Sequence, residues 1–251
     1  MKKALQVFGA LCAAATITVA AAAAGTKAEN FAEGLMQKEP IMGTVQWPEG
    51  AGTPQAIFQY QYPQFEAQTE ADKAINRYYQ AQARDLESAV QSMMDGEETL
   101  ESTIDFEVSH ASNRYLSVVQ TMRQMGGNAE TETLSADTFA RDGVYAGQLV
   151  TLSQMLGMEQ ENTLSVHESA AETLVYGLVW QIVERGMQNA DGDYLDGITP
   201  EDLKRSFSPE TDFYLDVDGN LVFFIQKGEI TGEIAGILTF PFASAEILSA
   251  L

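Results

Sequence analysis

The clearest pattern of apolar and polar positions lies near the C-terminus. Two β-prone runs, residues 213–215 and 221–225, flank residues 216–220, which contain the dipeptide Asp-Gly. Asp-Gly between apolar runs predicts a β-hairpin, because both central residues of a type I′ turn need positive φ. A third run, residues 237–242, alternates in polarity. Its Pro241 has no backbone N–H to donate, so we expect this strand end to lie at a sheet edge or at a strand terminus.

Shorter β-prone runs precede this C-terminal core. Residues 56–62 alternate between apolar and polar positions and stop at Pro63, which is typical of a half-buried strand. Residues 149–156 have the pattern of a strand end that continues into a short helical turn. Further strands are predicted at residues 44–47, 103–108, 115–121, 131–134 and 143–145, with a Gly-Gly turn at residues 126 and 127.

A long helix is predicted to begin after Thr69 and to stop at Gly96. Thr69 with Asp72 three positions later approximates a capping box, and Gly is a common residue at a helix end. Apolar residues then recur close to a 3.6-residue period, which predicts one buried stripe that packs against a sheet. The stripe consists of Ile75, Tyr79, Leu86, Val90 and Met93.

Two further helices follow, and they complete the fold prediction. The second begins after Ser165, supported by Glu168 three positions later, and its residues 174–183 are apolar nearly all round. We therefore expect that helix to be deeply buried. A third, short helix begins at Thr199, with Pro200 at its first position. Strands and helices interleave without an internal repeat, so the predicted class is α+β, with mixed or antiparallel sheets packed against two long helices.

The N-terminus has the pattern of an export signal. A basic start at Lys2 and Lys3 precedes an apolar, Ala-rich run and small residues that a signal peptidase accepts. Cleavage fits after Ala24 or after Ala28, and a retained membrane anchor is the alternative, since the run has about the length of a bilayer span. The predicted organisation is a signal peptide at 1–24, a lead-in at 25–55, a first subdomain at 56–156 and a second subdomain with the hairpin at 157–251.

The composition describes an acidic protein without disulfides. The 251 residues include 14 basic and 36 acidic ones, a formal charge of −22. Without Lys2 and Lys3 of the signal, 12 basic residues remain and the formal charge becomes −24. Such a surface repels nucleic acid and anionic lipid and attracts cations or basic proteins. Cys12 is the only cysteine and lies in the signal, so the core must supply its own stability.

The sequence contains no catalytic or metal-binding motif. Its two histidines are His110 and His167, and the latter lacks the second His of the helical zinc signature. There is no Gly-x-Ser-x-Gly elbow, Gly-rich phosphate loop or thiol nucleophile. The acidic turns at residues 189–197 and 216–220 fit no EF-hand register. We therefore predict no enzyme activity, metal or cofactor, although two of the 36 acids could still meet as a glycosidase-like pair.

A set of short motifs lies in order across residues 56–247. The set consists of Tyr62-Pro63-Gln64-Phe65, Ile75-Asn76, Gly126-Gly127, Gly147 with Leu149-Val150-Thr151-Leu152, Phe213-Tyr214-Leu215, Gly219, Leu221-Val222-Phe223, Glu229-Ile230, Ala235-Gly236 and Phe240-Pro241-Phe242. In order and spacing, these motifs resemble the non-catalytic extracytoplasmic domain shared by RsiV-type anti-sigma factors and PdaC-type peptidoglycan deacetylases. The resemblance implies that both predicted subdomains are RsiV/PdaC-like.

The resemblance also implies a recognition role outside the cytoplasm. No sigma-binding segment precedes the signal-like run and no deacetylase domain follows Leu251, so we expect a secreted or envelope-located binding protein without catalysis. RsiV-type domains recognise lysozyme, a basic protein, and the acidic charge of this chain would attract such a partner. Cell-wall glycan is a second possible ligand. The alternatives are an enzyme or accessory protein acting on cell-wall polysaccharide, and a structural partner in an envelope complex.

The candidate binding residues lie in the loop at residues 228–234. They are Glu229, Ile230, Glu233 and Ile234. Two exposed isoleucines beside two glutamates would supply both an apolar anchor and a charge for a basic partner. In the alternative interpretation, the two isoleucines pack into the core and the loop binds nothing.

The export signal generates the first testable prediction. We expect the protein isolated from its native host to begin near Gly25 or Glu29 and to contain no cysteine. Intact-mass spectrometry of the envelope and secreted fractions measures this directly. An intact Met1 in the envelope fraction would instead identify the apolar run as a retained anchor.

Overall fold

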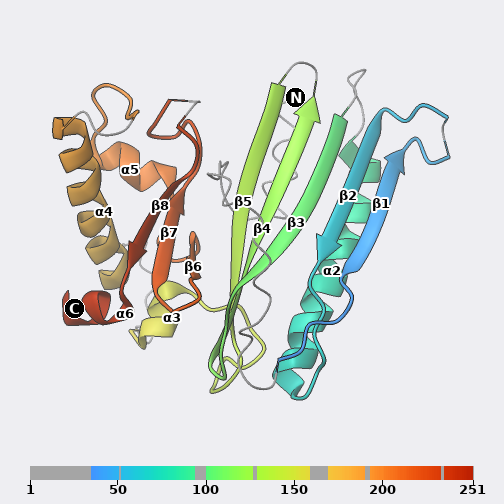
Figure 1. The fold of residues 1–251 in the computed structure, drawn as a ribbon, viewed down its shortest axis with the longest axis horizontal. Coiled ribbons are helices and arrows are strands. Elements are labelled where there is room, and N and C mark those ends of the chain that lie inside the picture. The colour runs from blue at the N-terminus through green and yellow to red at the C-terminus, as the bar shows by residue number, and fades with distance from the viewer. Residues whose placement is uncertain are drawn as a thin grey trace.

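The computed structural model describes residues 35–50, 52–93, 100–126, 129–158, 169–189, 193–232 and 235–250. Two β-sheets form the centre of the molecule, and helices lie on the outer side of each sheet (Figure 1). Among the described helices, none combines the length and the apolarity that crossing a bilayer requires.

The larger sheet has five strands in the order β1-β2-β3-β4-β5. The strands are β1 (Ile41–Trp47), β2 (Ala56–Tyr62), β3 (Leu100–Ala111), β4 (Tyr115–Gly126) and β5 (Ala129–Ala140). Helix α2 (Glu70–Met93) lies between β2 and β3 in the chain. β2 and β3 are parallel, and α2 serves as the long crossover connection that a parallel pair needs. The other neighbouring strands are antiparallel.

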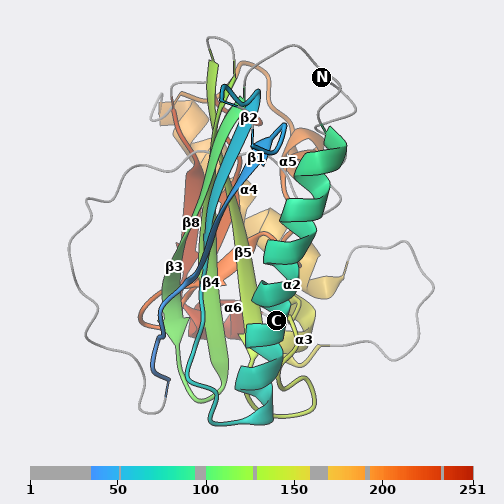
Figure 2. The same cartoon turned by 90° about the vertical axis from the view of Figure 1, so that its right-hand side faces the viewer.

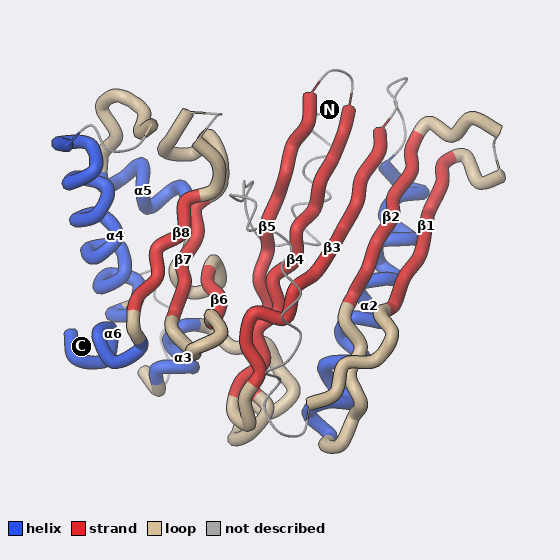
Figure 3. The backbone as a smooth tube through the Cα atoms, viewed as in Figure 1, coloured by secondary structure: helices blue, strands red, loops and turns tan. Residues whose placement is uncertain are grey.

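The smaller sheet has three antiparallel strands in the order β6-β7-β8. The strands are β6 (Phe213–Leu215), β7 (Leu221–Ile225) and β8 (Leu238–Phe242). The helices around it are α3 (Leu152–Leu156), α4 (Ala170–Asn189), α5 (Pro200–Ser206) and α6 (Ser244–Ala250) (Figure 3). As predicted, α5 begins with Pro200 after an N-cap at Thr199, and Pro241 lies in an edge strand.

Three apolar clusters hold these layers together. The first lies between α2 and the larger sheet, around the fully buried Tyr79 and Phe58. The second lies between the smaller sheet and helices α3 to α6. The third joins the two sheets through Leu134 of β5, Phe224 of β7 and Ile237. Removing this apolar surface from water is the main source of stability. It holds α2 against one side of the larger sheet (Figure 2) and the smaller sheet between the larger sheet and helix α4 (Figure 1).

The structure confirms the α+β class and most of the predicted strands. The strand expected near residues 44–47 is β1, and β3, β4 and β5 are longer than predicted, at 12 residues each. The strand predicted at residues 143–145 is wrong, because these residues form a turn after β5. Gly143 has φ +83°, outside the extended region, and Val144 is 86% exposed.

The first predicted helix is α2, and its start is confirmed in atomic detail. The Asp72 N–H donates to the Thr69 hydroxyl (3.1 Å), and the Thr69 N–H donates to the Asp72 carboxylate (3.0 Å). These two bonds form the expected capping box. The predicted stripe is buried at Ile75, Tyr79 and Leu86, whereas Gly96 and the side chains of Val90 and Met93 lie outside the described part.

The second long helix, α4, differs from its prediction in two respects. Its capping box uses Ser169 and Glu172, whose backbone N–H groups donate to each other's side chains (2.8 and 3.0 Å). The predicted start at Ser165 and Glu168 lies outside the described residues. The expectation of burial all round is wrong, because α4 forms an outer layer (Figure 1) and Ile182 is 40% exposed.

The predicted C-terminal hairpin is confirmed as β6 and β7, but its turn is not a two-residue type I′ turn. The Asp216 N–H donates to the Asn220 carbonyl (2.9 Å), and the Gly219 N–H donates to the Asp216 carbonyl (2.9 Å). The loop therefore has three residues, 217–219, with Gly219 in the left-handed region at φ +81°. The Asp216 carboxylate also accepts from the N–H groups of Asp218 and Asn220 (2.9 and 2.8 Å), which favours the longer turn.

This turn generates the second prediction. We expect Gly219→Val to lower the free energy of unfolding by about 1–3 kcal/mol, because a β-branched residue is strained at positive φ. A Cβ atom at this position would also lie 3.3 Å from the His110 ring. Thermal or urea unfolding measures the change.

Gly177 provides a control of opposite sign. It lies within α4, and a Cβ atom there would meet nothing within 4 Å. Gly177→Ala should therefore raise stability by about 1 kcal/mol. A Gly219→Val protein that unfolds at the parent's temperature would contradict the description of the turn.

Candidate functional site

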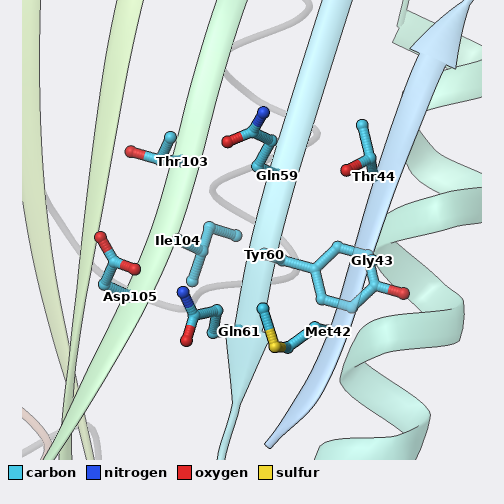
Figure 4. Close-up of a pocket in the computed structure, with 9 residues that line it drawn as sticks. All are labelled: Met42, Gly43, Thr44, Gln59, Tyr60, Gln61, Thr103, Ile104 and Asp105. Atoms are coloured by element: carbon cyan, nitrogen blue, oxygen red, sulfur yellow. The ribbon is translucent and has the colours of Figure 1, made fainter.

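Elements pack on both faces of the larger sheet, and the face opposite α2 is covered only in part. Helix α2 packs on one face, and the smaller sheet packs on the opposite face, where it contacts Val119, Leu134 and Ala136 of β4 and β5 and the end of β3 near His110. The uncovered rest of that opposite face consists of β1, β2, most of β3 and the ends of β4 and β5 that carry Arg123 and Glu132. We call this part the open face, and it presents the side chains of Met42, Thr44, Gln59, Gln61, Thr103 and Asp105 (Figure 4).

Strand register places these side chains in rows across the sheet. Thr44 lies opposite Gln59, and Gln59 lies opposite Thr103. The same row continues through Arg123 of β4 to Glu132 of β5. Side chains alternate between the two faces along each strand, so all five of these side chains lie on the open face. The side chains of the residues next to them in each strand point toward α2.

A shallow hollow of about 360 Å³ lies among β1, β2 and β3. Tyr60 and Gly43 form its edge, and the Tyr60 ring reaches across β1 at Gly43 (Figure 4). A Cβ atom at Gly43 would lie 2.2 Å from the Tyr60 hydroxyl oxygen, so no larger residue fits there without moving the ring. The Tyr60 hydroxyl donates to the Glu87 carboxylate of α2 (2.7 Å), and burial together with this acceptor raises the pKa of Tyr60 to about 12.

The open face is acidic, with one partly neutralised region. Arg123 forms an ion pair with Glu132 (2.8 Å) and lies 3.8 Å from a carboxylate oxygen of Asp105. Glu101 and Glu107, which alternate with Thr103 and Asp105 along β3, are exposed. Carboxylates arranged in this way provide hydrogen-bond acceptors and a negative potential. The amide and hydroxyl groups of the hollow add further donors and acceptors.

A buried polar cluster lies on the other face of the sheet, between β4, β5 and α2. The Asp137 carboxylate accepts from the Tyr78 hydroxyl (3.1 Å) and from the Gln120 amide (2.6 Å). Burial raises the pKa of Asp137 to about 6, and the hydrogen bonds that it accepts oppose this shift only in part. The Tyr79 hydroxyl is buried nearby, and burial together with Asp137 raises its pKa well above the usual value.

Two other carboxylates, the buried Asp72 and the half-buried Glu210, hold helix ends. Asp72 caps α2 and forms an ion pair with Arg141 (3.1 Å), and its pKa lies below the usual value because these partners outweigh the effect of burial. Glu210 accepts from the Ser153 N–H (2.9 Å) and the Ser169 hydroxyl (2.6 Å), at the starts of α3 and α4. Burial raises the pKa of Glu210, but the hydrogen bonds lower it by more, so that the pKa lies below its usual value.

Asp212 organises the turn that leads into β6. Its carboxylate accepts from the Ser208 N–H (2.6 Å), and its side chain and backbone are almost fully buried. Burial raises the pKa of Asp212 to about 6 despite this hydrogen bond. Each of these carboxylates therefore stabilises local backbone structure.

The predicted binding loop is only partly as expected. Glu229 is exposed, and partial desolvation raises its pKa. The expectation of an exposed Ile230 is wrong, because this side chain is fully buried in the cluster under α4. Glu233 and Ile234 lie outside the described residues. Sequence reasoning missed the open face, although the alternation of residues 56–62 signalled a strand with one polar side.

The residues examined for catalysis and metal binding have structural partners. His110 contacts the Asp216 backbone carbonyl through Nδ1 (2.9 Å) and so links the two sheets, while His167 lies outside the described residues. The described part of the chain contains no group of three or more His, Cys, Asp or Glu side chains arranged to hold a metal ion. The turn at residues 189–197 is described only in part, since residues 190–192 are not included.

Comparison with known proteins identifies the fold. No protein-family model and no curated protein matches the chain. A DUF3298-family protein of Pseudomonas aeruginosa has a similar structure, with a TM-score of 0.53 and 12% identity over 85% of this chain and 92% of that chain. A DUF3298 member of Bacteroides fragilis aligns with a TM-score of 0.47 and 12% identity over 84% and 90% of the two chains. The chain thus has the fold of DUF3298 proteins, the family of the RsiV/PdaC-like domain.

The buried carboxylates generate the third prediction, which concerns pH. The pKa values of Asp137 and Asp212 rise from 3.8 to about 6 on folding, so between these values the folded state binds more protons than the unfolded state. Stability should therefore increase as pH falls from 7 to 5, by about 1.3 kcal/mol for each group. Below about pH 4 the lowered pKa values of Asp72 and Glu210 reverse the trend, because their stabilisation is lost on protonation.

Urea unfolding at pH 5, 6 and 7 measures this effect. Asp137→Asn should flatten the slope between pH 5 and 7, because it removes one of the two titrating groups. Asp85→Asn is the matched control, since Asp85 is exposed on α2 and its loss should leave the parent's slope unchanged. Stability that does not rise on acidification would contradict the burial of both carboxylates.

Proposed function

We propose that the protein is a non-catalytic binding protein that acts outside the cytoplasm and recognises a macromolecule through its open face. The observation that carries this proposal is the uncovered part of the larger sheet, where Thr44, Gln59, Gln61 and Asp105 surround a shallow hollow. Small-molecule sites are usually deep clefts that enclose most of the ligand. A broad, shallow and polar surface is better suited to a protein or to a polymer.

The use of the buried acids supports a role without catalysis. General acid–base catalysis needs a carboxyl with a shifted pKa beside a space for substrate. Asp137 and Asp212 have raised pKa values, but the first is enclosed between α2 and the sheet and the second holds a turn. Asp105 and Glu132 on the open face are joined to Arg123 instead of to each other.

Charge favours a basic protein as the ligand. The chain carries a formal charge of −22, and Glu101, Asp105 and Glu107 add acidic groups along β3 of the open face. Opposite charges accelerate encounter, and a specific complex also needs uncharged contacts. The exposed Met42 and the amides of Gln59 and Gln61 could supply these contacts. A lysozyme-like protein is our leading candidate, and cell-wall glycan is the second.

Binding to lysozyme is the fourth prediction. We expect a complex that persists at 0.15 M salt, where the Debye length is about 8 Å and purely long-range attraction is screened. Glu107→Lys should weaken it about tenfold or more, since it reverses a charge on the open face. Glu184→Lys changes the net charge by the same amount as Glu107→Lys, but it lies on α4, in a different layer of the molecule. We therefore expect it to have little effect on lysozyme binding. Calorimetric titration at 0.02 and 0.15 M salt measures both.

Three results would redirect the proposal. Binding that disappears at 0.15 M salt, or that is equal for any basic protein, would leave only a charged surface. Weakening by Glu229→Lys and not by Glu107→Lys would move the site to the loop at residues 228–234. Reproducible turnover of peptidoglycan by the purified protein, lost on mutation of a carboxylate pair, would replace the binding role by the enzymatic alternative.

A further inference from the structure

The two sheets have four edges, and three of them are protected. β8 contains Pro241, which offers no N–H to another strand. β6 has only three residues, and its Leu215 N–H donates to the Ser117 hydroxyl of β4 (3.1 Å). The segment after β5 folds back along that strand, with hydrogen bonds between Val150 and Thr138 (2.9 Å) and between Ala140 and Gln148 (3.0 Å).

The fourth edge, β1, has none of these protections among the residues that the structure describes. It is seven residues long, and its sequence IMGTVQW contains no charged residue and no proline. Within the described part of the chain, β1 pairs only with β2, so alternate residues direct N–H and C=O groups away from the sheet. Natural proteins usually protect such an edge with charges, proline or a covering element, because it can pair with another strand.

We propose that β1 pairs antiparallel with β1 of a second copy, about a two-fold axis at Thr44. In this register the strand is self-complementary. The cross-strand pairs are Ile41 with Trp47, Met42 with Gln46, Gly43 with Val45, and Thr44 with Thr44. Pro40 and Pro48 lie directly outside the strand at equal distances from Thr44, so they end the ladder symmetrically.

The pairing suits both faces of the sheet. On the α2 face, the half-buried side chains of Ile41, Val45 and Trp47 would be covered further by their counterparts. Gly43 carries no side chain, and the Tyr60 ring lies over it. In the proposed register, Val45 of the second copy would therefore pack next to the Tyr60 ring. On the open face, the polar pairs join two five-stranded sheets into one, so the two hollows face the same side. Isologous pairing of this kind closes at a dimer.

Charge gives this dimer a distinctive salt dependence. Each copy carries a formal charge of −22, so two copies repel each other at low salt. Salt shortens the Debye length from about 30 Å at 0.01 M to about 8 Å at 0.15 M, while the uncharged strand contacts are unaffected. Dimerisation should therefore strengthen with salt, whereas binding of a basic partner should weaken. The dimer is thus independent of the proposed function and can fail or succeed separately.

Sedimentation velocity of the purified protein at 0.02, 0.15 and 0.5 M NaCl tests the proposal. A strand pair buries less than a standard interface, so we expect a concentration-dependent monomer–dimer equilibrium below about 0.2 mM protein. Thr44→Lys and Thr44→Glu each place two like charges opposite one another, so both should remove most of the dimer. Gln59→Lys, on the adjacent strand of the same face, is the matched control and should leave it intact.

The pair of Thr44 variants separates strand pairing from general charge effects. If only net repulsion limited association, Thr44→Lys would strengthen the dimer and Thr44→Glu would weaken it. A disulfide trap adds a positive readout: Thr44→Cys in a Cys12→Ser background should cross-link on oxidation, because directly opposed residues have Cα atoms about 4.5–5.5 Å apart. Gln59→Cys in the same background should not.

Two outcomes would overturn the proposal. One is a monomer at every salt concentration, in which case the β1 edge would be left for a strand of another protein. The other is a dimer that both Thr44 variants leave unchanged, which would place the interface elsewhere.

Discussion

The buried ion pair between Asp72 and Arg141 is the interaction on which the arrangement of the larger sheet depends. The exposed fractions of these two side chains are 0% and 8%, and Arg141 also donates to the Ser112 carbonyl (2.7 Å). The pair thus joins the start of α2 to the β3–β4 turn and to the end of β5. Leaving one buried charge unpaired costs about 3–5 kcal/mol, so the two partners are held in place together. Helix α2 is thereby fixed on one face, and the opposite face is left for the smaller sheet.

That opposite face explains the main features of the surface. The smaller sheet is too narrow to cover five strands, and its apolar contact reaches only β4 and β5 around Leu134 and Phe224. β1, β2 and β3 therefore present polar side chains to solvent, and within the described part of the chain the outer edge of β1 pairs with no other strand. Gly43 allows the Tyr60 ring to cover β1 from the other side, so the edge strand is held by packing as well as by its ladder. Recognition and self-association are accordingly proposed for adjacent parts of the same region.

The acidic residues divide into two groups with different roles. Those that are buried or half-buried, such as Asp72, Asp137 and Glu210, each accept hydrogen bonds that hold helix ends or join α2 to the sheet. Those that are exposed give the surface its negative potential, which acts on partners at a distance. The same negative charge that favours a basic ligand opposes association between two copies. Salt concentration would therefore set the balance between the two proposed interactions.

Local patterns in the sequence were sufficient to predict most of the elements. The alternation of residues 56–62, the capping residue Thr69 and the dipeptide at Asp218 each act within a few residues, through side-chain period, helix-end hydrogen bonding and turn geometry. For that reason β2, the start of α2 and the C-terminal hairpin were predicted correctly. The strand expected around Val144 failed because β propensity describes a side chain, whereas the φ of Gly143 and the hydrogen bonds of the turn decide the backbone.

Only the tertiary structure determined which of these elements are exposed to solvent and which are buried. An apolar helix such as α4 is half exposed when it lies in the outermost layer, and Ile230 is buried because α4 packs above it. The sequence indicated an acidic protein with an RsiV/PdaC-like order of motifs, but it contained no sign that the smaller sheet covers only part of the larger one. Strand order, the extent of coverage and the partner of Arg141 depend on contacts between residues far apart in the chain. A pattern within a few residues carries no information about those contacts, which is why the open face and the free β1 edge emerged only from the fold.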